Sequence, residues 1–395
     1  MHGVRKSYKE WAIEESDSLR QDIVNLSRAI HGKPELGMRE YYASQLLGDF
    51  LEQQRFEVIR GFCGIPTAFF ARFKSGEGPV IALLSEYDAL PELGHACGHN
   101  LIGSASVGAA VAVSRVLSQL KGTVVVMGTP AEETNGAKVL MVEAGAFTGI
   151  DAAMMFHPGD SNAVEISSLA MEALEFTFWG KAVHAAACPQ LGINALEALI
   201  LFFNGVNSLR QHLRDDVFIH GIIVDGGNSP NVIPERASAQ FYIRARQQNQ
   251  LEMARERIKT CAEGAAAMIG ARVEWRNFEF SYQSMISNPT LAGLFRENLK
   301  LLGVRDLAGP REAMGSIDMG NVSQVVPSIH PYLALNGKFV PHSREFANVA
   351  GSEIGEAVMM TAAKAMACTA IDLYLQPELA VKARAELQRR VGKGL

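Results

Sequence analysis

The sequence predicts an α/β protein: a mostly parallel, helix-covered sheet interrupted by a smaller inserted α+β domain. In the first 165 residues or so, short, continuously apolar runs alternate with helical patterns, as in sheets buried on both faces. From about Ser167 the runs alternate between apolar and polar residues, which is typical of strands with one open face. A length of 395 residues also favours two domains.

The first segment, residues 1–166, alternates helices and strands. Ser16 and Asp17 can cap a helix that runs to about Ala29, because their side-chain oxygens accept from free backbone N–H groups. Further helices are expected over residues 39–54, after Asn100 and around 137–144. The apolar, β-rich runs predict strands at residues 67–73, 79–85, 122–128 and 151–156.

The second segment, residues 167–285, has a different element order. Its patterns predict β-α-β-β-α-β, the ferredoxin-like order with helices on one face of an antiparallel sheet. The strands are expected at 172–181, 217–227, 237–246 and 271–280, with helices at 194–213 and 249–269. The chain then returns to helices at 291–302 and 352–373. We therefore predict one domain from residues 1–166 and 286–395, with residues 167–285 as an inserted domain.

Composition excludes several classes of function. A net charge of −5 lacks the basic surplus that nucleic-acid binding needs. Five scattered cysteines cannot form a disulfide framework, which predicts a reducing, cytoplasmic location. The longest uncharged apolar run, residues 101–114, is too short and too rich in small residues to span a bilayer, and no apolar signal segment stands near residue 1. We expect no membrane partner and a packed core helix there.

Potential ligands and acids follow three of the predicted strands. Asp88, Cys97 and His99 come after the strand at 79–85, while Glu132 and Glu133 come after the strand at 122–128, and His157 after the strand at 151–156. Because the carboxyl ends of parallel strands meet at one rim of a sheet, these side chains should converge there.

This residue set suits a divalent transition metal. Thiolate and imidazole favour zinc-like ions and carboxylate admits manganese, whereas magnesium or calcium rarely takes such a mixed shell. Gly98 allows the tight turn that points Cys97 and His99 at one centre. Of the two adjacent glutamates, one can bind metal while the other takes a proton from the attacking water. The predicted cofactor is Mn²⁺ or Zn²⁺, with one or two ions per subunit.

A series of motifs resembles one known family. In chain order they are HGKPELGMREYYAS, EYDALPELGHACGHN, GTPAEET, MMFHPG, WGKAVHAA, NVIPE, GSIDMGNVS and PHSREF. Together they resemble the family 20 metallopeptidases over about residues 20–375. The Cys-Gly-His form and the MGNVS segment are most similar to the branch of aminobenzoyl-glutamate hydrolases, β-alanyl-lysine dipeptidases and indole-acetyl-amino-acid hydrolases. The resemblance implies a metal-dependent hydrolase.

Residue by residue, the resemblance implies roles at the sheet rim. Glu132 would be the general base and later the acid, and Asp88 would orient a ligand. Glu86 stands where many relatives have a metal-binding histidine, so the number of ions depends on this position. The implied metal ligands are Cys97, His99, Glu133, His157 and His342.

The same resemblance gives the insert its function. It would serve as the lid and as the surface that forms a homodimer or a higher homo-oligomer, with His184 reaching the active site of the partner subunit to stabilise an oxyanion. Asn231 and Arg244 would hold the substrate carboxylate or carbonyl. His330 is a further pocket-lining candidate, unless it merely caps a strand.

The predicted reaction is hydrolysis of a C–N bond, the amide of an N-acyl amino acid or a dipeptide-like substrate. The expected partner is a small anionic molecule, for which an aromatic group is one option. Two alternatives stay open: a hydrolytic deaminase that releases ammonia from an aromatic amine at the same site, and a non-catalytic metal-binding scaffold. Individually, Cys97 could be an apolar filler, Glu132 and Glu133 a solvated pair at a helix start, and Arg244 a surface ion-pair partner.

Overall fold

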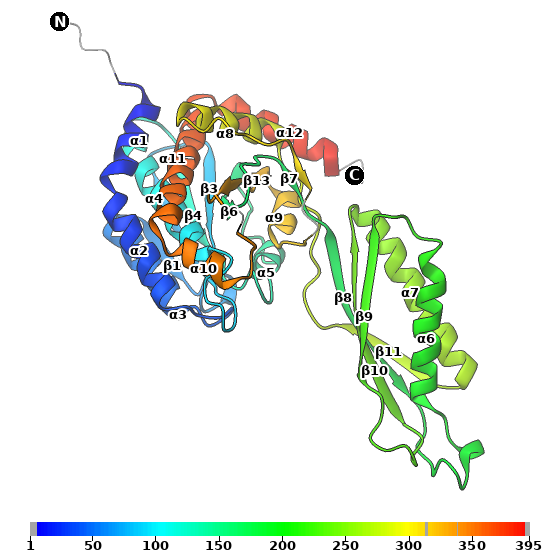
Figure 1. Ribbon diagram of the computed structural model, residues 1–395. Helices are drawn as coiled ribbons and strands as arrows, with labels where there is room; N and C mark the ends of the chain where they lie inside the picture. The colour runs from blue at the N-terminus through cyan, green and yellow to red at the C-terminus, as the bar shows by residue number, and fades with distance from the viewer. Residues whose placement is uncertain (1–5, 313–314, 338, 392–395) are drawn as a thin grey trace, which may run out of the picture. The chain divides into compact units, whose positions relative to one another are not determined.

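The computed structural model describes residues 6–312, 315–337 and 339–391, which divide into two compact units. Among these residues, unit 1 contains 6–167, 285–312 and 317–391, and unit 2 contains 168–284 with 315–316. Figure 1 colours the chain by residue number, so the blue, cyan and red parts belong to unit 1 and the green part to unit 2. Unit 1 is therefore built from segments on both sides of unit 2 in the sequence.

The main sheet of unit 1 has the strand order β1-β2-β4-β3-β5-β13. The parallel strands β3, β4, β5 and β13 form its larger part, and β2 runs antiparallel to β4, with β1 antiparallel to β2. This arrangement confirms the predicted mostly parallel α/β sheet. The strands are β1 (Glu57–Arg60), β2 (Phe69–Lys74), β3 (Val80–Ser85), β4 (Thr123–Gly128), β5 (Ala152–Met154) and β13 (Ser328–Ile329).

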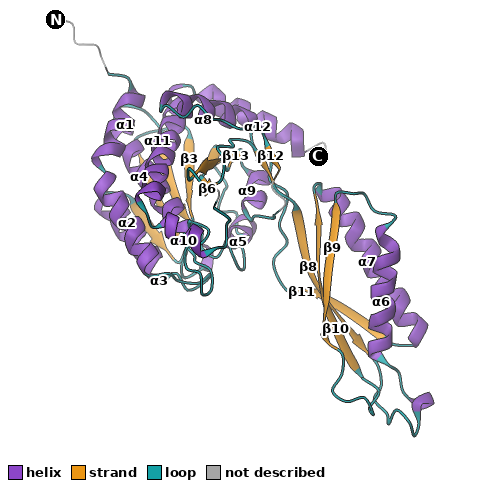
Figure 2. Ribbon diagram, viewed as in Figure 1, coloured by secondary structure: helices purple, strands orange, loops and turns teal. Residues whose placement is uncertain are grey.

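Helices and two small sheets complete unit 1, as Figure 2 shows in purple and orange. The two-stranded parallel sheets pair β6 (His157–Gly159) with β14 (Tyr332–Ala334) and β7 (Ile166–Ser167) with β12 (Arg311–Glu312). The helices are α1 (Tyr8–Ser18), α2 (Arg20–Gly32), α3 (Tyr41–Gln53), α4 (His99–Leu117), α5 (Ala137–Glu143), α8 (Pro289–Leu301), α9 (Met319–Val325), α10 (Arg344–Ala350), α11 (Glu353–Leu375) and α12 (Pro377–Val391).

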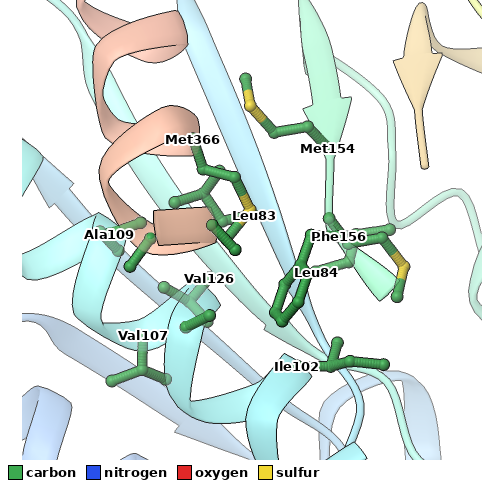
Figure 3. Packing of buried hydrophobic residues seen from close by; sticks show 14 of the residues in the cluster. Leu83, Leu84, Ile102, Val107, Ala109, Val126, Met154, Phe156 and Met366 are labelled. Atoms are coloured by element: carbon green, nitrogen blue, oxygen red, sulfur yellow. The ribbon is translucent and has the colours of Figure 1, made fainter. Parts of the chain in front are cut away.

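Helix α4 lies at the centre of the hydrophobic core. Its small side chains allow close packing on every side: a Cβ added to Gly108 would lie 2.3 Å from Ile23 Cδ1 of α2. Ser106 Oγ donates to Leu84 O, which ties the helix to β3. Figure 3 shows Ala109 of α4 and Met366 of α11 packed with Leu83 and Val126 of the sheet. The start of α4 is thereby held rigidly at the end of β3.

Helices α4 and α11 are long and apolar enough to cross a membrane by length and composition alone. Their apolar windows are 94% and 78% buried inside the protein, respectively, as expected of core helices. The prediction of a packed core helix over residues 101–114 is confirmed.

Unit 2 is a four-stranded antiparallel sheet with the strand order β11-β8-β10-β9. Phe176, Phe202 and Phe241 pack together in its core, on the sheet face that carries the helices. The alternate residues of β10, including Tyr242 and Arg244, lie on the opposite face. The elements in chain order are β8 (Ala170–Trp179), α6 (Ala195–Arg210), β9 (Val217–Asp225), β10 (Arg236–Ala245), α7 (Gln248–Ile269) and β11 (Arg272–Asn277).

The structure corrects one detail of the sequence prediction. Ser16 does not cap a helix: it lies inside α1, where its Oγ donates to Ala12 O, and Ser7 caps α1 through a capping box with Glu10. The mostly parallel sheet contains one strand, β2, that runs antiparallel to β4 and β3. Only five residues separate β2 from β3, which is too few for the crossover that a parallel arrangement needs.

Candidate metal centre

The turn that precedes α4 places two potential ligands beside the end of β3. Gly98 adopts φ +81°, and a Cβ there would lie 2.5 Å from Pro158 Cγ, so only glycine fits between Cys97 and His99. A Cβ on Gly103, one turn further along, would lie 2.6 Å from the carbonyl oxygen of Glu86. The two glycines let the helix start approach the neighbouring strand ends closely.

Asp88 is a buried acceptor that fixes two neighbouring elements. His99 Nδ1 donates to Asp88 Oδ1 at 2.8 Å, and the backbone N–H of Glu133 donates to Oδ2 at 2.9 Å. Burial alone would raise the pKa of Asp88, but the contact with His99 outweighs it and the pKa is lowered. Because Nδ1 of His99 is held by Asp88, Nε2 is the ring nitrogen left for a metal, and the contact with Asp88 also raises the pKa of His99, so a bound ion would displace the proton from Nε2.

His157, at the start of β6, is oriented in the same way. Its Nδ1 donates to Pro158 O at 2.7 Å, which leaves Nε2 facing Cys97 Sγ at 3.4 Å. Burial, together with the nearby His99, lowers the pKa of His157 to about 4, so the ring is neutral at pH 7 and able to bind a metal.

Ligand-type atoms gather in three overlapping clusters. Within each cluster the atoms lie within 4.8 Å of one another. Cys97 belongs to two clusters, as do His99 and Glu133, so the clusters form one continuous group. They are Cys97–His99–His157, Cys97–Glu133–His342 and His99–Glu132–Glu133.

Unpaired buried atoms show that this group fits a metal ion. His99 Nε2 and Glu133 Oε1 are buried and make no hydrogen bond in the described part of the chain. Their close polar neighbours are other ligand-type atoms: His342 Nε2 lies 3.2 Å from Glu133 Oε1, and His99 Nε2 lies 4.0 Å from it. Such atoms are costly unless they bind something, and an imidazole nitrogen, a carboxylate oxygen and a thiol are donors that Zn²⁺ or Mn²⁺ accepts. The donor set is therefore chemically complete for a transition ion.

The adjacent glutamates have opposite electrostatic environments. Burial and the charges of Glu133 and Glu86 raise the pKa of Glu132 well above its ordinary value. Burial also acts to raise the pKa of Glu133, but its contacts with His342 and His99 outweigh this, and the net shift is downward. Two neighbouring carboxyl groups with pKa values pushed apart are suited to different tasks, proton transfer and ligation.

Of the two late histidines, His342 lies among the ligands. Its Nε2 is 3.2 Å from Glu133 Oε1, and its backbone N–H donates to Ala96 O at 2.9 Å. His342 adopts φ +62°, a strained conformation that often occurs at functional sites. His330, at the end of β13, stacks on His157 instead, with ring centroids 5.5 Å apart, and neither of its nitrogens has a partner among the described residues.

The three candidates on unit 2 fall into two places. His184 and Asn231 are neighbours, because Ala185 N donates to Asn231 O at 2.9 Å. The N–H groups of Ala186 and Ala187 donate to His184 Nδ1, which makes the exposed Nε2 a donor. Beside this loop is a cavity of about 400 Å³ lined by residues that include Asn194, Asn228 and Pro230.

Arg244 lies apart from that loop, on the helix-free face of the unit 2 sheet. Its guanidinium stacks 5.6 Å from the centroid of Tyr242, and its Nε is buried without a partner among the described residues. Within the same described residues, none of the ion pairs of unit 2 involves Arg244.

Sequence reasoning missed several buried charges around the group. Lys138 of α5 contacts both Glu86 and Asp318, which precedes α9. Glu40, before α3, accepts from the N–H of Ala131, next to Glu132. Glu40 and Asp318 both stand within family-like motifs, but nothing in the spacing of those motifs showed that the two side chains meet the strand ends.

The fold and the site define a class, an α/β metallohydrolase, and comparisons with known proteins bear this out. The sequence profile of peptidase family M20/M25/M40 matches residues 82–371. The Xaa-Arg dipeptidase of Mus musculus is 37% identical, over 96% of this chain and 92% of the mouse protein. One of the subunits of the p-aminobenzoyl-glutamate hydrolase of Escherichia coli (strain K12) is 36% identical, over 72% of this chain and 63% of that subunit.

The fold is similar to that of the Bacillus subtilis YXEP protein, a dinuclear metal binding peptidase from the M20 family. The two structures superpose with a TM-score of 0.72 at 23% identity, covering 91% of this chain and 99% of the other. The chain belongs to peptidase family M20/M25/M40 and is a metal-dependent hydrolase of carbon–nitrogen bonds. The resemblance predicted from the motifs is confirmed, and the amide-hydrolase prediction is favoured over the deaminase and scaffold alternatives.

Proposed function

We propose that this protein cleaves the amide bond of a dipeptide or N-acyl amino acid with Glu132 as the general base. The observation that carries the proposal is the position of Glu132 at the edge of a continuous group of metal ligands, with a raised pKa. A carboxylate of raised pKa binds a proton more readily, which is what proton transfer between water and a leaving nitrogen requires.

We assign the metal to the residues of the three clusters other than Glu132. A bound Mn²⁺ or Zn²⁺ would polarise the scissile carbonyl and make the attacking water more acidic. Asp88 holds the ring of His99 and the backbone of Glu133 in place, while Glu132 takes the proton and later donates it to the departing nitrogen. The assigned ligands are Cys97, His99, Glu133, His157 and His342.

For the substrate, we propose a free carboxylate held by Arg244. An arginine with no carboxylate partner among the described residues, stacked on a tyrosine, suits a bidentate contact with such a group. The names of relatives, a dipeptidase and an aminobenzoyl-glutamate hydrolase, fit substrates that keep a free carboxylate. His330, stacked on His157, would line the pocket, and an aromatic group on the substrate could extend this stack.

Unit 2 is proposed as the lid and the homodimer surface of a cytoplasmic enzyme. His184, whose Nε2–H faces solvent, would donate to the oxyanion in the site of a partner subunit, and Asn231 beside it would contact the substrate. A mixed-subunit experiment tests this role. Combining a His184→Ala subunit with a Glu132→Gln subunit should restore activity if the histidine acts across the dimer.

The experiment that tests the base is Glu132→Gln. We expect kcat to fall by about 10²–10⁴-fold while metal content stays at the wild-type value. As a matched control, Glu133→Gln should lower the metal content itself. A Glu132→Gln enzyme with near-normal kcat refutes the assignment, and release of ammonia from aromatic amines without cleavage of dipeptides would favour the deaminase.

A further inference from the structure

Three charged side chains are buried together beside the metal-ligand group: Glu86, Lys138 and Asp318. Lys138 Nζ lies 2.6 Å from Glu86 Oε1 and 2.8 Å from Asp318 Oδ1. The backbone N–H of Lys138 also donates to Asp318 Oδ2 at 3.2 Å. All three residues have zero exposed surface, so the contacts are shielded from water.

A buried ion triad of this kind needs an explanation other than stability. Burial acts to lower the pKa of Lys138, but the charges of Asp318 and Glu86 outweigh it and keep the ammonium protonated. Apolar side chains of similar volume often stabilise a core as well as buried ion pairs do, whereas ion pairs fix orientation. The triad therefore fixes the orientation of one of its own side chains.

The two carboxylate oxygens of Glu86 have different environments. Oε1 is held by Lys138, while Oε2 is buried with no hydrogen-bond partner among the described residues. Glu86 Oε2 lies 3.5 Å from His99 Nε2, which likewise makes no hydrogen bond there. Two ligands of one tetrahedral ion are separated by roughly 3.3–3.7 Å, so the two atoms are spaced like donors to a common ion.

We propose that Lys138, anchored by Asp318, is a positioning residue that holds Glu86 with Oε2 directed at the metal on His99. The inference rests on the metal centre proposed above and adds Glu86 to its ligands. The position that departs from the family's histidine would then still supply a donor, an oxygen in place of a nitrogen.

The chemistry of lysine gives this role a specific signature. An ammonium group only donates hydrogen bonds, so in Glu86→Gln it would bind the amide oxygen and turn the NH₂ group toward the metal. An NH₂ group cannot bind a metal, and the variant should bind it weakly. If the lysine is removed as well, the amide can turn over and present its oxygen.

We would measure Co²⁺ affinity of metal-depleted full-length protein by visible absorption, which also reports coordination geometry. Glu86→Gln should lower the affinity by about 10–100-fold, as loss of supporting contacts at metal sites does. The triple variant Glu86→Gln, Lys138→Met, Asp318→Asn leaves no buried charge of the triad unpaired. It should bind Co²⁺ at least about fivefold more tightly than Glu86→Gln. Lys364→Met, which breaks the 2.6 Å ion pair with Asp17 on α1, is the matched control and should match the wild type.

The possible results separate the inference from the proposal beneath it. Wild-type protein that binds no Co²⁺ would refute the metal centre itself. Wild-type binding with unchanged affinity in Glu86→Gln would overturn only the role of Glu86. A triple variant that binds no more tightly than Glu86→Gln would show that Lys138 is merely structural. Circular dichroism checks that each variant is folded before its affinity is compared.

Discussion

Replacing Glu40 with glutamine should make the metal-free protein more stable at alkaline pH. Glu40 is fully buried, and its Oε1 accepts from Ala131 N–H at 2.8 Å. Burial, followed by the charge of Asp88, raises the pKa of Glu40 to about 7 from an ordinary value of 4.5. Glutamine keeps the acceptor for Ala131 and removes the charge.

The sign and size of the effect follow from proton linkage. The folded state binds an extra proton on Glu40 between pH 4.5 and 7, so wild-type stability falls as pH rises through that range. The rise of about 2.5 in the pKa lowers the free energy of unfolding of the wild type by about 3.4 kcal/mol well above pH 7, relative to its value at low pH. About 0.8 kcal/mol of this loss has already occurred at pH 5. The advantage of Glu40→Gln should therefore grow by about 2.5 kcal/mol between pH 5 and pH 8.5.

The assay must report on unit 1 alone, because a chain with two units need not unfold in one step. Trp11 lies in unit 1 and Trp179 and Trp275 in unit 2, so a Trp179→Phe, Trp275→Phe background makes Trp11 the reporter. Urea unfolding would be followed by fluorescence with EDTA present. Glu143→Gln, which changes an exposed glutamate of α5 in the same unit, serves as the control. An equal effect of Glu40→Gln at both pH values would refute the reasoning.

Two further predictions concern substrate binding and packing. Arg244→Ala should raise KM at least tenfold for a dipeptide with a free carboxylate and leave kcat nearly unchanged. For the C-terminally amidated dipeptide, the variant and the wild type should have the same KM. An equal increase in KM for both substrates would contradict carboxylate binding. Gly103→Ala should lower the free energy of unfolding by about 1–3 kcal/mol, because its Cβ would lie 2.6 Å from Glu86 O. Thermal unfolding measures this change. The control is Gly264→Ala in α7, where an added Cβ has open space, and this variant should not be destabilised.

The ligands at the carboxyl ends of the strands could be predicted because each one follows its strand closely in the sequence. Each of β3, β4 and β5 is an apolar run followed within a few residues by a ligand or an acid, and parallel strands bring such ends together. The choice of His342 over His330 came from the resemblance alone. The geometry now supplies a physical reason, since His342 contacts Glu133 while His330 stacks behind His157.

The buried partners could not be predicted because they are distant in sequence. Lys138 and Asp318 are 180 positions apart and meet only when α9 packs beside α5. A lysine near the start of a helix is ordinarily solvated, so its type and position carried no sign of burial. Glu40 reaches the turn before Glu132 from 91 positions away for the same reason. Pattern reasoning finds what lies at strand ends, whereas the packing of helices decides what surrounds it.

The charges around the ligand group imply that metal affinity rises with pH. Burial, together with the charge of Glu133, raises the pKa of the Cys97 thiol well above its ordinary value, so the thiol holds its proton at neutral pH. A metal binds the thiolate and must displace that proton, which costs less as pH increases. Mn²⁺ or Zn²⁺ affinity measured at pH 6, 7 and 8 should rise by up to about tenfold per pH unit for each proton released. Cys97→Ser should bind more weakly, with a shallower slope. An affinity that does not change with pH would mean that the sulfur is not a ligand.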